Sequence, residues 1–423
     1  MTGGIQDEID SQSADVAQQV IGWYRQIHQD PELPNRESAT AKIVADHLRG
    51  LGFDDVKTGI AHHGVVGVLK GAKPGNKVMG LRADMDALPI RELQDLPYRS
   101  TKVDDDYPGG PFPVAHMCGH DAHTAMLMGA ATVLANVRRE LPGTVKVIFQ
   151  PAEEGPPITE PGGARMMVQQ GVLEDPTPDM MLALHTGPFP DHTVLYTPNH
   201  ALASSDYLSI KIHGAGVHGS TPWLGMDPMP VAAEIINALA QVYRQVPATD
   251  AMTISIGKVI NEGRFNIIAP DVELIGTIRV IHDEIIGDVH RRVERIATHI
   301  AEAHGLTATT EFMQHVPAVN NDPAWLERTL PTVRRVMGHD NVVEVPPVMV
   351  YDDASEFVNP IGGAYLFLGG QDVELADGSP RPKRGGRGFW FNHSPNFYWN
   401  EANLVNGVKL HSHVAFDFLC GNI

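Results

Sequence analysis

Cysteine is scarce in this chain: Cys118 and Cys420 are the two present among 423 residues. Two cysteines this far apart cannot staple a protein of this size, which excludes a disulfide scaffold and indicates a reducing compartment. Long apolar runs are absent as well, since no stretch approaches the roughly 20 residues that a membrane-spanning helix needs. The first ten residues are acidic and lack an apolar run, so we expect no signal peptide there. A cytoplasmic protein without membrane association is therefore expected.

Positive charge is also in short supply, with 32 lysines and arginines against 51 aspartates and glutamates. The formal net charge of −19 would repel phosphate groups, which excludes nucleic acid as a partner. The chain does contain 43% hydrophobic and 20% charged residues, a composition typical of globular rather than disordered proteins. A single core is unusual for 423 residues, so two domains are expected.

Three short apolar runs in the first half of the chain lead into polar residues of chemical interest. Stretches with helical spacing lie before and between them. Apolar strands that alternate with helices predict a mixed, largely parallel α/β sheet flanked by helices. Because ligands bind beyond the carboxyl ends of the strands in such sheets, the polar residues are expected to meet there. The runs are Val78–Leu81 before Asp84 and Asp86, Val145–Phe149 before Glu153 and Glu154, and Met180–Leu184 before His185.

Helices are predicted around these runs by apolar positions that recur at helical spacing. They cover about Ala14–His28, Ala39–Leu51 and Ala122–Glu140. Asp121 is expected to cap the third helix, because its carboxylate can accept the free backbone N–H groups of the first turn. A late buried strand is predicted over Ala364–Leu368, so α/β character returns near the C-terminus.

The pattern changes at about Thr197. Strand-like alternation and helix-like spacing then follow one another in the order β-α-β-β-α-β, which is the order of a split βαβ or ferredoxin-like fold. Since α/β character resumes afterwards, this region is predicted to be a separate α+β domain inserted into the first. The predicted boundaries are 1–197 and 316–423 for the α/β domain, and 198–315 for the inserted domain.

One short segment, His116-Met-Cys-Gly-His-Asp-Ala-His123, holds a thiol and three imidazoles. Cys118 and His120 are separated by one residue, so in an extended segment their side chains would point the same way and could hold one ion. A thiolate with an imidazole suits zinc and other borderline metals. The alternative is a buried structural cysteine at a helix start with incidental histidines. The density of possible ligands favours a metal site, although the pattern assigns no role to His116 or His123.

Glu153 and Glu154 are adjacent carboxylates behind one of the predicted strands. Two carboxylates packed together repel each other unless a cation or a proton lies between them. A hydrolytic metal site can use both, because one binds metal while the other takes a proton from the attacking water. A solvated surface pair is the alternative for an isolated Glu-Glu sequence. The position between Pro151 and Gly155, at a strand end, favours the site.

Single histidines at three further places extend this set. His185 follows a predicted strand, His393 lies in Asn-His-Ser-Pro-Asn-Phe, and His218 lies in a glycine-rich turn of the inserted domain. A lone histidine is more often structural than functional, so their value depends on the whole set. Asp84 and Asp86 could orient metal-binding histidines by accepting the second ring N–H.

Together, these motifs resemble the di-metal aminoacylase, hippurate hydrolase and indole-acetyl-amino-acid hydrolase group of metallopeptidase-like amidohydrolases. The resemblance runs from about His28 to the C-terminus. Met117, Ala122 and Asn400 depart from residues that are common in this group. Gln371–Phe391 is a long and basic stretch that could shape a pocket or an interface. The matching motifs are His28-x-x-Pro31-Glu32, Arg82-Ala-Asp84-Met-Asp86-Ala-Leu-Pro89, the segment 116–123, Gln150-Pro-Ala-Glu-Glu-Gly155, Leu184-His185, the His218 turn and His393-Ser-Pro-x-Phe397.

The resemblance implies a metal-dependent enzyme in which Glu153 is the general base. It also implies that His218 polarises the substrate carbonyl, in its own site or in that of a neighbouring subunit. Asn266 and Arg279 match positions that hold the substrate carboxylate, and the planar fork of an arginine suits that role. The inserted domain resembles a lid and dimerisation domain, so a homodimer or higher homo-oligomer is expected. Two divalent ions, of zinc, manganese, cobalt or nickel, would be bound by Cys118, His120, Glu154, His185 and His393.

The activity that this resemblance implies is hydrolysis of the amide bond in N-acyl amino acids, amino-acid conjugates or dipeptides. A metallo-carboxypeptidase or dipeptidase of the same architecture is the first alternative. A thiol hydrolase with Cys118 as nucleophile is the second, and a non-catalytic metal- or peptide-binding protein is the third. Sensitivity to chelators would separate the metal enzymes from the thiol enzyme. The sequence leaves open the acyl group, the amino acid and the native metal.

Overall fold

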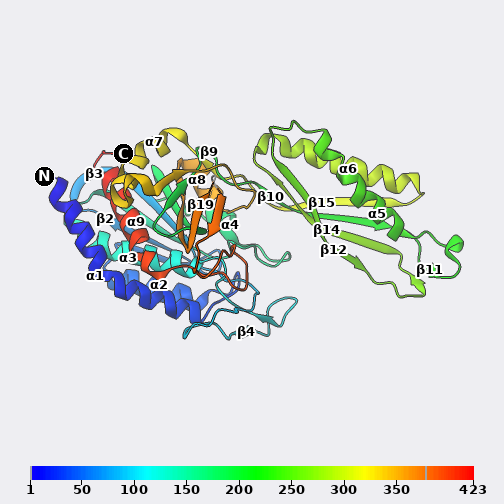
Figure 1. The fold of residues 1–423 in the computed structure, drawn as a ribbon, viewed down its shortest axis with the longest axis horizontal. Coiled ribbons are helices and arrows are strands. Elements are labelled where there is room, and N and C mark those ends of the chain that lie inside the picture. The colour runs from blue at the N-terminus through cyan, green and yellow to red at the C-terminus, as the bar shows by residue number, and fades with distance from the viewer. Residues whose placement is uncertain (1, 377–378) are drawn as a thin grey trace. The chain divides into compact units, whose positions relative to one another are not determined.

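The computed structural model describes residues 2–376 and 379–423, which form two compact units (Figure 1). The large unit takes in the chain up to Asn199 and then Asn320–Pro346 and Asp353–Ile423. The small unit consists of His200–Val319 together with the returning segment Pro347–Asp352. The alternation pattern of the sequence, which predicted an insertion over 198–315, contained no sign of that returning segment.

An eight-stranded mixed sheet forms the centre of the large unit. In sheet order its strands are β1 (Asp55–Ile60), β2 (Gly64–Lys70), β6 (Pro142–Gln150), β3 (Lys73–Asp84), β7 (Met180–Pro190), β18 (Gly363–Gln371), β8 (Val194–Tyr196) and β17 (Val342–Glu344). Neighbouring strands run parallel from β6 through β3 and β7 to β18, and again between β8 and β17. The pairs β1–β2, β2–β6 and β18–β8 are antiparallel. The mixed, largely parallel sheet predicted from the sequence is confirmed.

Helices cover this sheet, and one of them, α3 (His120–Asn136), is buried from His120 through Leu134. It contacts β3, β6 and β7 as well as three other helices, α1, α2 and α9, so every face of it meets protein. Close packing needs a glycine, because a Cβ on Gly407 of α9 would lie 1.9 Å from the sulfur of Met126 on α3. The helices of this unit are α1 (Thr2–Gln29), α2 (Ser38–Gly50), α3, α4 (Gly163–Gln169), α7 (Pro323–Met337), α8 (Ser355–Ile361) and α9 (Leu404–Leu419).

The start of α3 corrects one expectation from the sequence. The helix begins at His120 with Gly119 before it, so Asp121 lies in the first turn and does not cap the helix. Its carboxylate instead accepts a hydrogen bond from the Ala122 N–H at 2.9 Å and lies 2.6 Å from Nδ1 of His28. The negative charge still lies at the positive end of the helix dipole, where it is stabilising.

Short strands complete the large unit. A hairpin of β19 and β20 follows β18 and begins the stretch Gln371–Phe391, of which residues 377 and 378 lie outside the described part of the chain. The short strands are β4 (Val103–Asp104), β5 (Phe112–Pro113), β9 (Asn199–His200, whose second residue belongs to the small unit), β16 (Asn320–Asn321), β19 (Val373–Ala376) and β20 (Ser379–Pro382).

The small unit is an antiparallel four-stranded sheet with two helices on one face (Figure 1). Along the chain its main elements are β10 (Ser205–His213), α5 (Pro228–Leu239), β12 (Met252–Asn261), β14 (Asp271–Val280), α6 (Ile286–Ala303) and β15 (Thr307–Val316). The sheet order is β12-β14-β10-β15, so the first and third strands lie side by side at its centre. This is the predicted β-α-β-β-α-β, ferredoxin-like fold. A small ribbon of β11 (Val217–His218) and β13 (Ile267–Ile268) is attached to it.

The core of the small unit explains this arrangement. Alternate residues of β10 and β14, such as Leu208, Ile210, Val272 and Leu274, are fully buried. They pack against the apolar stripes of α5 and α6. Across the described residues of both units, none of the helices has the length and apolar character needed to cross a membrane.

Candidate metal centre

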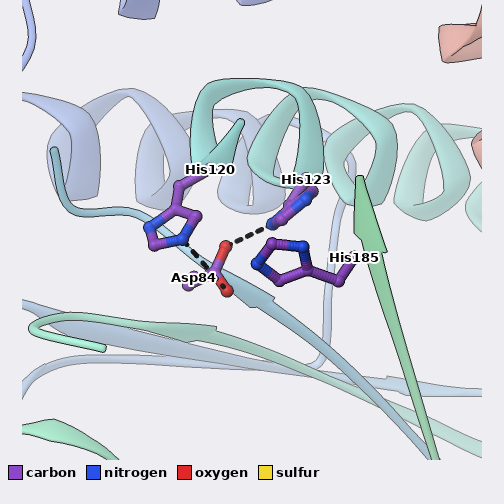
Figure 2. Close-up of side chains that lie close together, drawn as sticks. All are labelled: Asp84, His120, His123 and His185. Atoms are coloured by element: carbon purple, nitrogen blue, oxygen red, sulfur yellow. Dashed lines mark hydrogen bonds and ion pairs between the residues drawn. The ribbon is translucent and has the colours of Figure 1, made fainter. Parts of the chain in front are cut away.

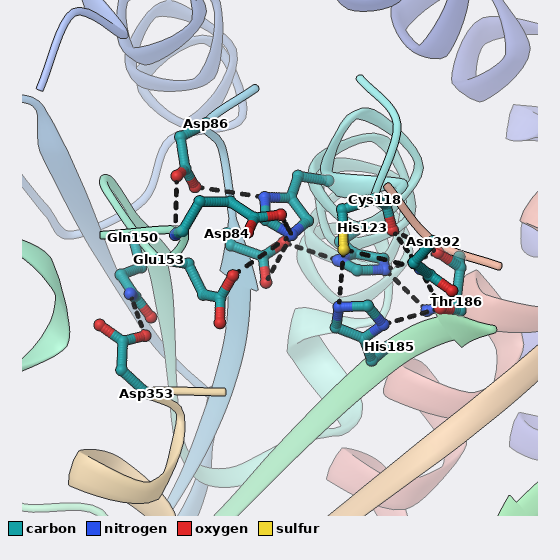
Figure 3. A network of polar contacts seen from close by, with 12 residues as sticks. Asp84, Asp86, Cys118, His123, Gln150, Glu153, His185, Thr186, Asp353 and Asn392 are labelled. Carbon is teal, nitrogen blue, oxygen red and sulfur yellow. Dashed lines mark hydrogen bonds and ion pairs between the residues drawn. The ribbon is translucent and has the colours of Figure 1, made fainter. Parts of the chain in front are cut away.

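Strands β3, β6 and β7 of the large unit bring several candidate site residues to one place (Figures 2 and 3). Strand β3 ends at Asp84, and Glu153 and Glu154 come shortly after the end of the parallel strand β6. His185 was expected to follow a strand, but β7 continues to Pro190, so His185 lies within it and pairs with Phe367 of β18. Site residues therefore lie at or beyond the carboxyl ends of β3 and β6, as expected for such sheets, whereas His185 lies within β7.

A tight turn at Gly119 brings Cys118 and His120 together. Gly119 has a φ of 92°, and a Cβ at this position would lie 2.1 Å from Oγ1 of Thr186. Glycine alone tolerates both conditions. The extended conformation expected for this pair is wrong, because His120 already belongs to α3. The two side chains converge through the turn and the first helical residue.

His120 is oriented by a carboxylate and faces several others. Its Nδ1 lies 3.2 Å from Oδ1 of Asp86, as the sequence analysis suggested for one of the two aspartates. Its buried Nε2 has no hydrogen-bond partner among the described residues. That nitrogen lies 3.8 Å from Asp84, 3.6 Å from Glu153 and 3.9 Å from Glu154. A buried nitrogen left without a partner among carboxylates is expected where a cation binds.

His185 and His393 reach the same place from distant parts of the chain. The Nδ1 of His185 donates to the carbonyl oxygen of Thr186 at 2.7 Å, which directs Nε2 to within 3.6 Å of the Cys118 sulfur. The Nε2 of His393 lies 3.0 Å from Oε1 of Glu154, and half of its side chain is exposed. The thiol, three imidazoles and a carboxylate that the sequence singled out are thus brought together.

His123 lies in the same cluster but is already engaged by protein groups. Figure 2 shows the Asp84 carboxylate among the rings of His120, His123 and His185, whose possible ligand atoms lie within 4.8 Å of one another. The backbone N–H of Thr186 donates to Nε2 of His123 at 2.7 Å. Nδ1 of the neutral ring therefore carries the proton, which it donates to Oδ1 of Asp84 at 2.6 Å. His123 orients its neighbours and has no ring nitrogen left for a metal.

The electrostatics of the centre favour bound cations. Burial raises the pKa of the Cys118 thiol, but the imidazoles of His185 and His120 outweigh this effect and hold the pKa well below its usual value. Burial lowers the pKa of His393, whereas Glu154 and Cys118 raise it, and the net pKa is about 11. Protonated imidazoles thus balance the thiolate and carboxylates when no cation is bound. A divalent ion can supply that positive charge instead.

The donor set fits divalent metal ions. Cys118, His120 and Glu154 offer a sulfur, a nitrogen and an oxygen whose ligand atoms lie within 4.8 Å of one another. Mixed sulfur, nitrogen and oxygen donors suit zinc and its borderline neighbours in the first transition row. The carboxylate on Nδ1 of His120 and the carbonyl on Nδ1 of His185 are also typical of metal sites.

The remaining predicted residues belong to the small unit. His218 in β11 and Asn266 beside β13 lie close together, because the Gly219 N–H donates to the Asn266 carbonyl at 2.8 Å. The guanidinium of Arg279 in β14 lies 4.4 Å from the ring centre of Tyr351, which comes from the returning segment. His218 and Asn266 are exposed, whereas Arg279 is half-buried.

The structure adds residues that sequence reasoning did not find. Asn392 and Thr186 contact the segments that carry the predicted ligands. His28 is buried between Asp121 at 2.6 Å and Glu92 at 3.1 Å. His28 begins one of the matching motifs, but the sequence assigned no role to it. The signal for Asn392 and Thr186 was only that each stands next to a predicted ligand.

The fold and this centre define a class of protein. The large α/β unit holds a buried cluster of thiol, imidazole and carboxylate groups that includes two adjacent glutamates, and a split-βαβ unit carries further polar groups. These are the features of a metal-dependent hydrolase.

A family model described as Peptidase family M20/M25/M40 matches residues 80–417. The chain belongs to this family, and it is a metal-dependent amidohydrolase.

Known relatives cover nearly the whole chain. Thermostable carboxypeptidase 1 of Saccharolobus solfataricus is 34% identical over 94% of this chain and 95% of its own length. IAA-amino acid hydrolase ILR1-like 4 of Arabidopsis thaliana is 34% identical, over 95% of this chain and 86% of that protein. Hippurate hydrolase of Campylobacter jejuni is 32% identical, over 93% of this chain and 95% of that protein.

Solved structures show the same architecture. A protein from methicillin resistant Staphylococcus aureus superposes with a TM-score of 0.82 at 28% identity, over 98% of this chain and all of that one. The Bacillus subtilis YXEP protein, described as a dinuclear metal binding peptidase from the M20 family, superposes with a TM-score of 0.73 at 26% identity. That match covers 96% of this chain and 99% of the Bacillus protein.

Proposed function

We propose that this protein hydrolyses the amide bond of N-acyl amino acids, with Glu153 as the general base. The observation that carries the proposal is a second buried carboxylate beside the candidate ligands: Glu154 lies 3.0 Å from His393, and Glu153 lies 3.6 Å from Nε2 of His120. A protein that only binds metal has no need of a second carboxylate in this position. Relatives named hippurate hydrolase and IAA-amino acid hydrolase support this substrate class.

Cys118, His120, Glu154, His185 and His393 are the proposed metal ligands. Asp86 and the Thr186 carbonyl hold the Nδ1 atoms of His120 and His185, and their Nε2 atoms face Glu153 and the Cys118 sulfur, at 3.6 Å each. When bound, two divalent ions would lower the pKa of the attacking water and polarise the substrate carbonyl. The dinuclear metal binding of the Bacillus relative supports a pair of ions. Zinc, manganese, cobalt and nickel are the candidates.

Glu153 moves the proton. It accepts a proton from the attacking water at a carboxylate oxygen and then passes the proton to the nitrogen of the leaving amino acid. Burial at 4% exposure keeps bulk water away from this carboxylate. The carboxylate must be ionised before attack, so nearby positive charge is required.

His218 is the proposed donor to the substrate carbonyl oxygen. The backbone N–H of Ser220 donates to its Nδ1 at 3.1 Å, so Nδ1 accepts and the proton of the neutral ring lies on Nε2. An exposed Nε2–H can stabilise the negative charge that develops on a carbonyl oxygen. Asn266 and Arg279 are proposed to hold the substrate carboxylate, in the same subunit's site or in that of a partner.

A homodimer is the proposed assembly. Phe265, next to Asn266, is 97% exposed, and Trp223, close to His218 in the sequence, is 75% exposed. Large apolar side chains exposed together favour contact with another protein surface. Light scattering coupled to size exclusion measures the assembly, and a monomer at micromolar concentration contradicts it. The cytoplasmic location expected from the sequence stays a prediction.

A panel of substrates tests the activity. Metal-free protein is loaded with each candidate metal and assayed on N-acetyl, N-benzoyl and indole-acetyl amino acids and on dipeptides. We expect at least one N-acyl amino acid to be cleaved, and activity to disappear after treatment with EDTA. Preference for unacylated peptides would instead favour a carboxypeptidase, which the Saccharolobus relative supports as the second candidate. Failure with every substrate and metal contradicts the proposal.

The two cysteines separate the metal enzyme from a thiol enzyme. Cys118→Ser should weaken metal binding and change the preferred metal, since it removes the soft donor. Cys420→Ser is the matched control, because Cys420 is a free cysteine outside the centre. A chain that keeps full activity in EDTA but loses it with Cys118→Ser is a thiol hydrolase.

A further inference from the structure

Three segments that carry proposed metal ligands meet at one asparagine side chain. We infer that Asn392 is a positioning residue whose side-chain amide holds the segments of Cys118, His185 and His393 in register for metal binding. The inference rests on the proposed function, because it concerns the same metal centre. Asn392 itself contacts neither metal nor substrate in this role.

The side chain of Asn392 contacts the Cys118 and Thr186 segments (Figure 3), and its own segment carries His393. Its Nδ2 donates to the carbonyl oxygen of Cys118 at 3.0 Å and to that of Thr186 at 3.2 Å. The same nitrogen lies 3.6 Å from the Cys118 sulfur. The next residue, His393, donates its backbone N–H to the Met117 carbonyl at 2.7 Å. One dipeptide is thus docked on the turn before α3 and on β7.

Chain connectivity does not hold these segments together. Asn392 is 274 positions from Cys118 and 206 from Thr186. The loop that ends at Asn392 is fixed further upstream, where Gln371 donates to the Trp390 carbonyl at 2.8 Å and accepts its N–H at 3.1 Å. Between Trp390 and His393, the amide of Asn392 is therefore the side-chain link to the metal-binding segments.

His393 needs such a link, because its backbone has a φ of 70°. This left-handed conformation is unfavourable for a residue with a Cβ, and it persists only where the surroundings enforce it. The Asn392 amide on one side and the bond from the His393 N–H on the other enforce it here. Without the amide, the turn can relax and carry the imidazole of His393 away from Glu154.

The amide also bears on the sulfur. An N–H directed at a thiolate stabilises its negative charge and tunes its bond to a metal. A carboxylate at position 392 would place oxygen atoms against two carbonyl oxygens and the thiolate, all of which are acceptors. Asn392→Asp therefore reverses the interaction at nearly constant size, whereas Asn392→Ala only removes it.

The test compares these two variants with Asn396→Ala. Asn396 lies in the same loop, and no described residue contacts its side chain through a hydrogen bond. Each protein is stripped of metal and titrated with zinc in competition with a chelator, and with cobalt while the thiolate-to-cobalt absorption band is recorded. Metal content per chain, apo-protein melting temperature, kcat and KM complete the measurements.

We expect Asn392→Ala to lower metal affinity about 10- to 100-fold and to weaken and shift the cobalt–thiolate band. The main kinetic effect should be a decrease in kcat, with a smaller change in KM. Asn392→Asp should be more severe. Asn396→Ala should match the wild type, and apo-protein melting temperatures should differ little. Wild-type metal affinity and cobalt spectrum in Asn392→Ala would overturn the inference.

Two further outcomes are separable. If the wild type itself binds no metal, the proposed function fails, whereas normal wild-type binding with an unaffected Asn392→Ala removes only the role of Asn392. If Asn392→Ala does not fold, Asn392→Ser decides, because its shorter hydroxyl cannot reach both carbonyls. Wild-type metal affinity in Asn392→Ser, or failure of both variants to fold, overturns the positioning role in favour of a purely structural one.

Discussion

The metal centre of the large unit and the His218 turn of the small unit hold their polar side chains in different ways. In the large unit, His120, His123 and Asp84 are buried and each is held by groups from distant parts of the chain. In the small unit, His218 is exposed, and its ring is held by Ser220, two residues along the chain. A buried polar group must find partners or cost stability, whereas an exposed one can use water. The large unit is therefore preorganised, and the His218 turn depends on what approaches it.

Glu153→Gln should have the largest effect on turnover, and it tests the preorganised centre of the large unit. The amide keeps the size of the side chain but cannot take a proton, so kcat should fall about 10²- to 10⁴-fold. Metal content should remain at the wild-type value, because Glu153 is not a proposed ligand. Steady-state kinetics and elemental analysis of the same preparation measure both. Turnover close to the wild type would remove Glu153 from the mechanism.

His218→Ala tests the role of the His218 turn in the small unit. Loss of one donor to the carbonyl oxygen should lower kcat about 10²- to 10³-fold. Because the side chain is exposed, the melting temperature and metal content should stay unchanged. Ser220→Ala keeps the backbone N–H on Nδ1 and should have a smaller effect. A large loss of stability in His218→Ala would break the contrast between the two regions.

Gly119→Ala should affect stability more than catalytic chemistry. The alanine would have to keep a positive φ, and its Cβ would lie 2.1 Å from Oγ1 of Thr186. We therefore expect the free energy of unfolding to fall by about 1–3 kcal/mol. Weaker metal binding should accompany it, since the turn positions Cys118 and His120. Gly52→Ala is the matched control, because Gly52 also has a positive φ but has no atom within 4 Å of the added Cβ. Equal losses in the two variants, measured by denaturant unfolding, would remove the contact with Thr186 from the argument.

The smallest expected effect is a pH dependence of stability that involves His28. Burial lowers the pKa of His28, but Asp121 and Glu92 raise it, from 6.5 to about 10. A pKa that is higher in the folded than in the unfolded state adds stability that is complete below pH 6.5 and is lost as pH rises through about 10. Melting temperatures should therefore fall more steeply over that interval in the wild type than in His28→Asn. Identical slopes would show that His28 does not titrate in this way.

Local patterns were sufficient for the fold class. Apolar runs such as Met180–Leu184 predicted buried parallel strands, and alternation after Thr197 predicted the split βαβ unit. Both predictions depend on periodicity within one element, which the structure confirms. Boundaries that depend on other elements were less accurate: β7 extends to Pro190, and Pro347–Asp352 returns to the small unit. Those residues take their conformation from neighbours that are remote in the sequence.

The residues that lie close in sequence also made the metal centre predictable. Cys118 and His120, and likewise Glu153 and Glu154, are near neighbours in the sequence, so their possible role in a metal site could be inferred without a structure. The sequence did not predict how Cys118 and His120 converge, because Gly119 turns the chain where an extended segment was expected. Asp121 was expected to cap a helix starting at Ala122, but α3 begins two residues earlier, at His120, and the carboxylate binds His28.

The sequence by itself determined the types of candidate ligand, the adjacent pair of carboxylates and the alternation that builds each unit, because these are properties of neighbouring residues. Only the tertiary structure decided which group each ring nitrogen of these histidines faces. Nδ1 of His120 faces Asp86, both nitrogens of His123 are engaged, and Asn392 links three distant segments. The physical reason is that a buried polar atom takes its partner from whatever packing places beside it. Spacing along the chain contains no information about that partner.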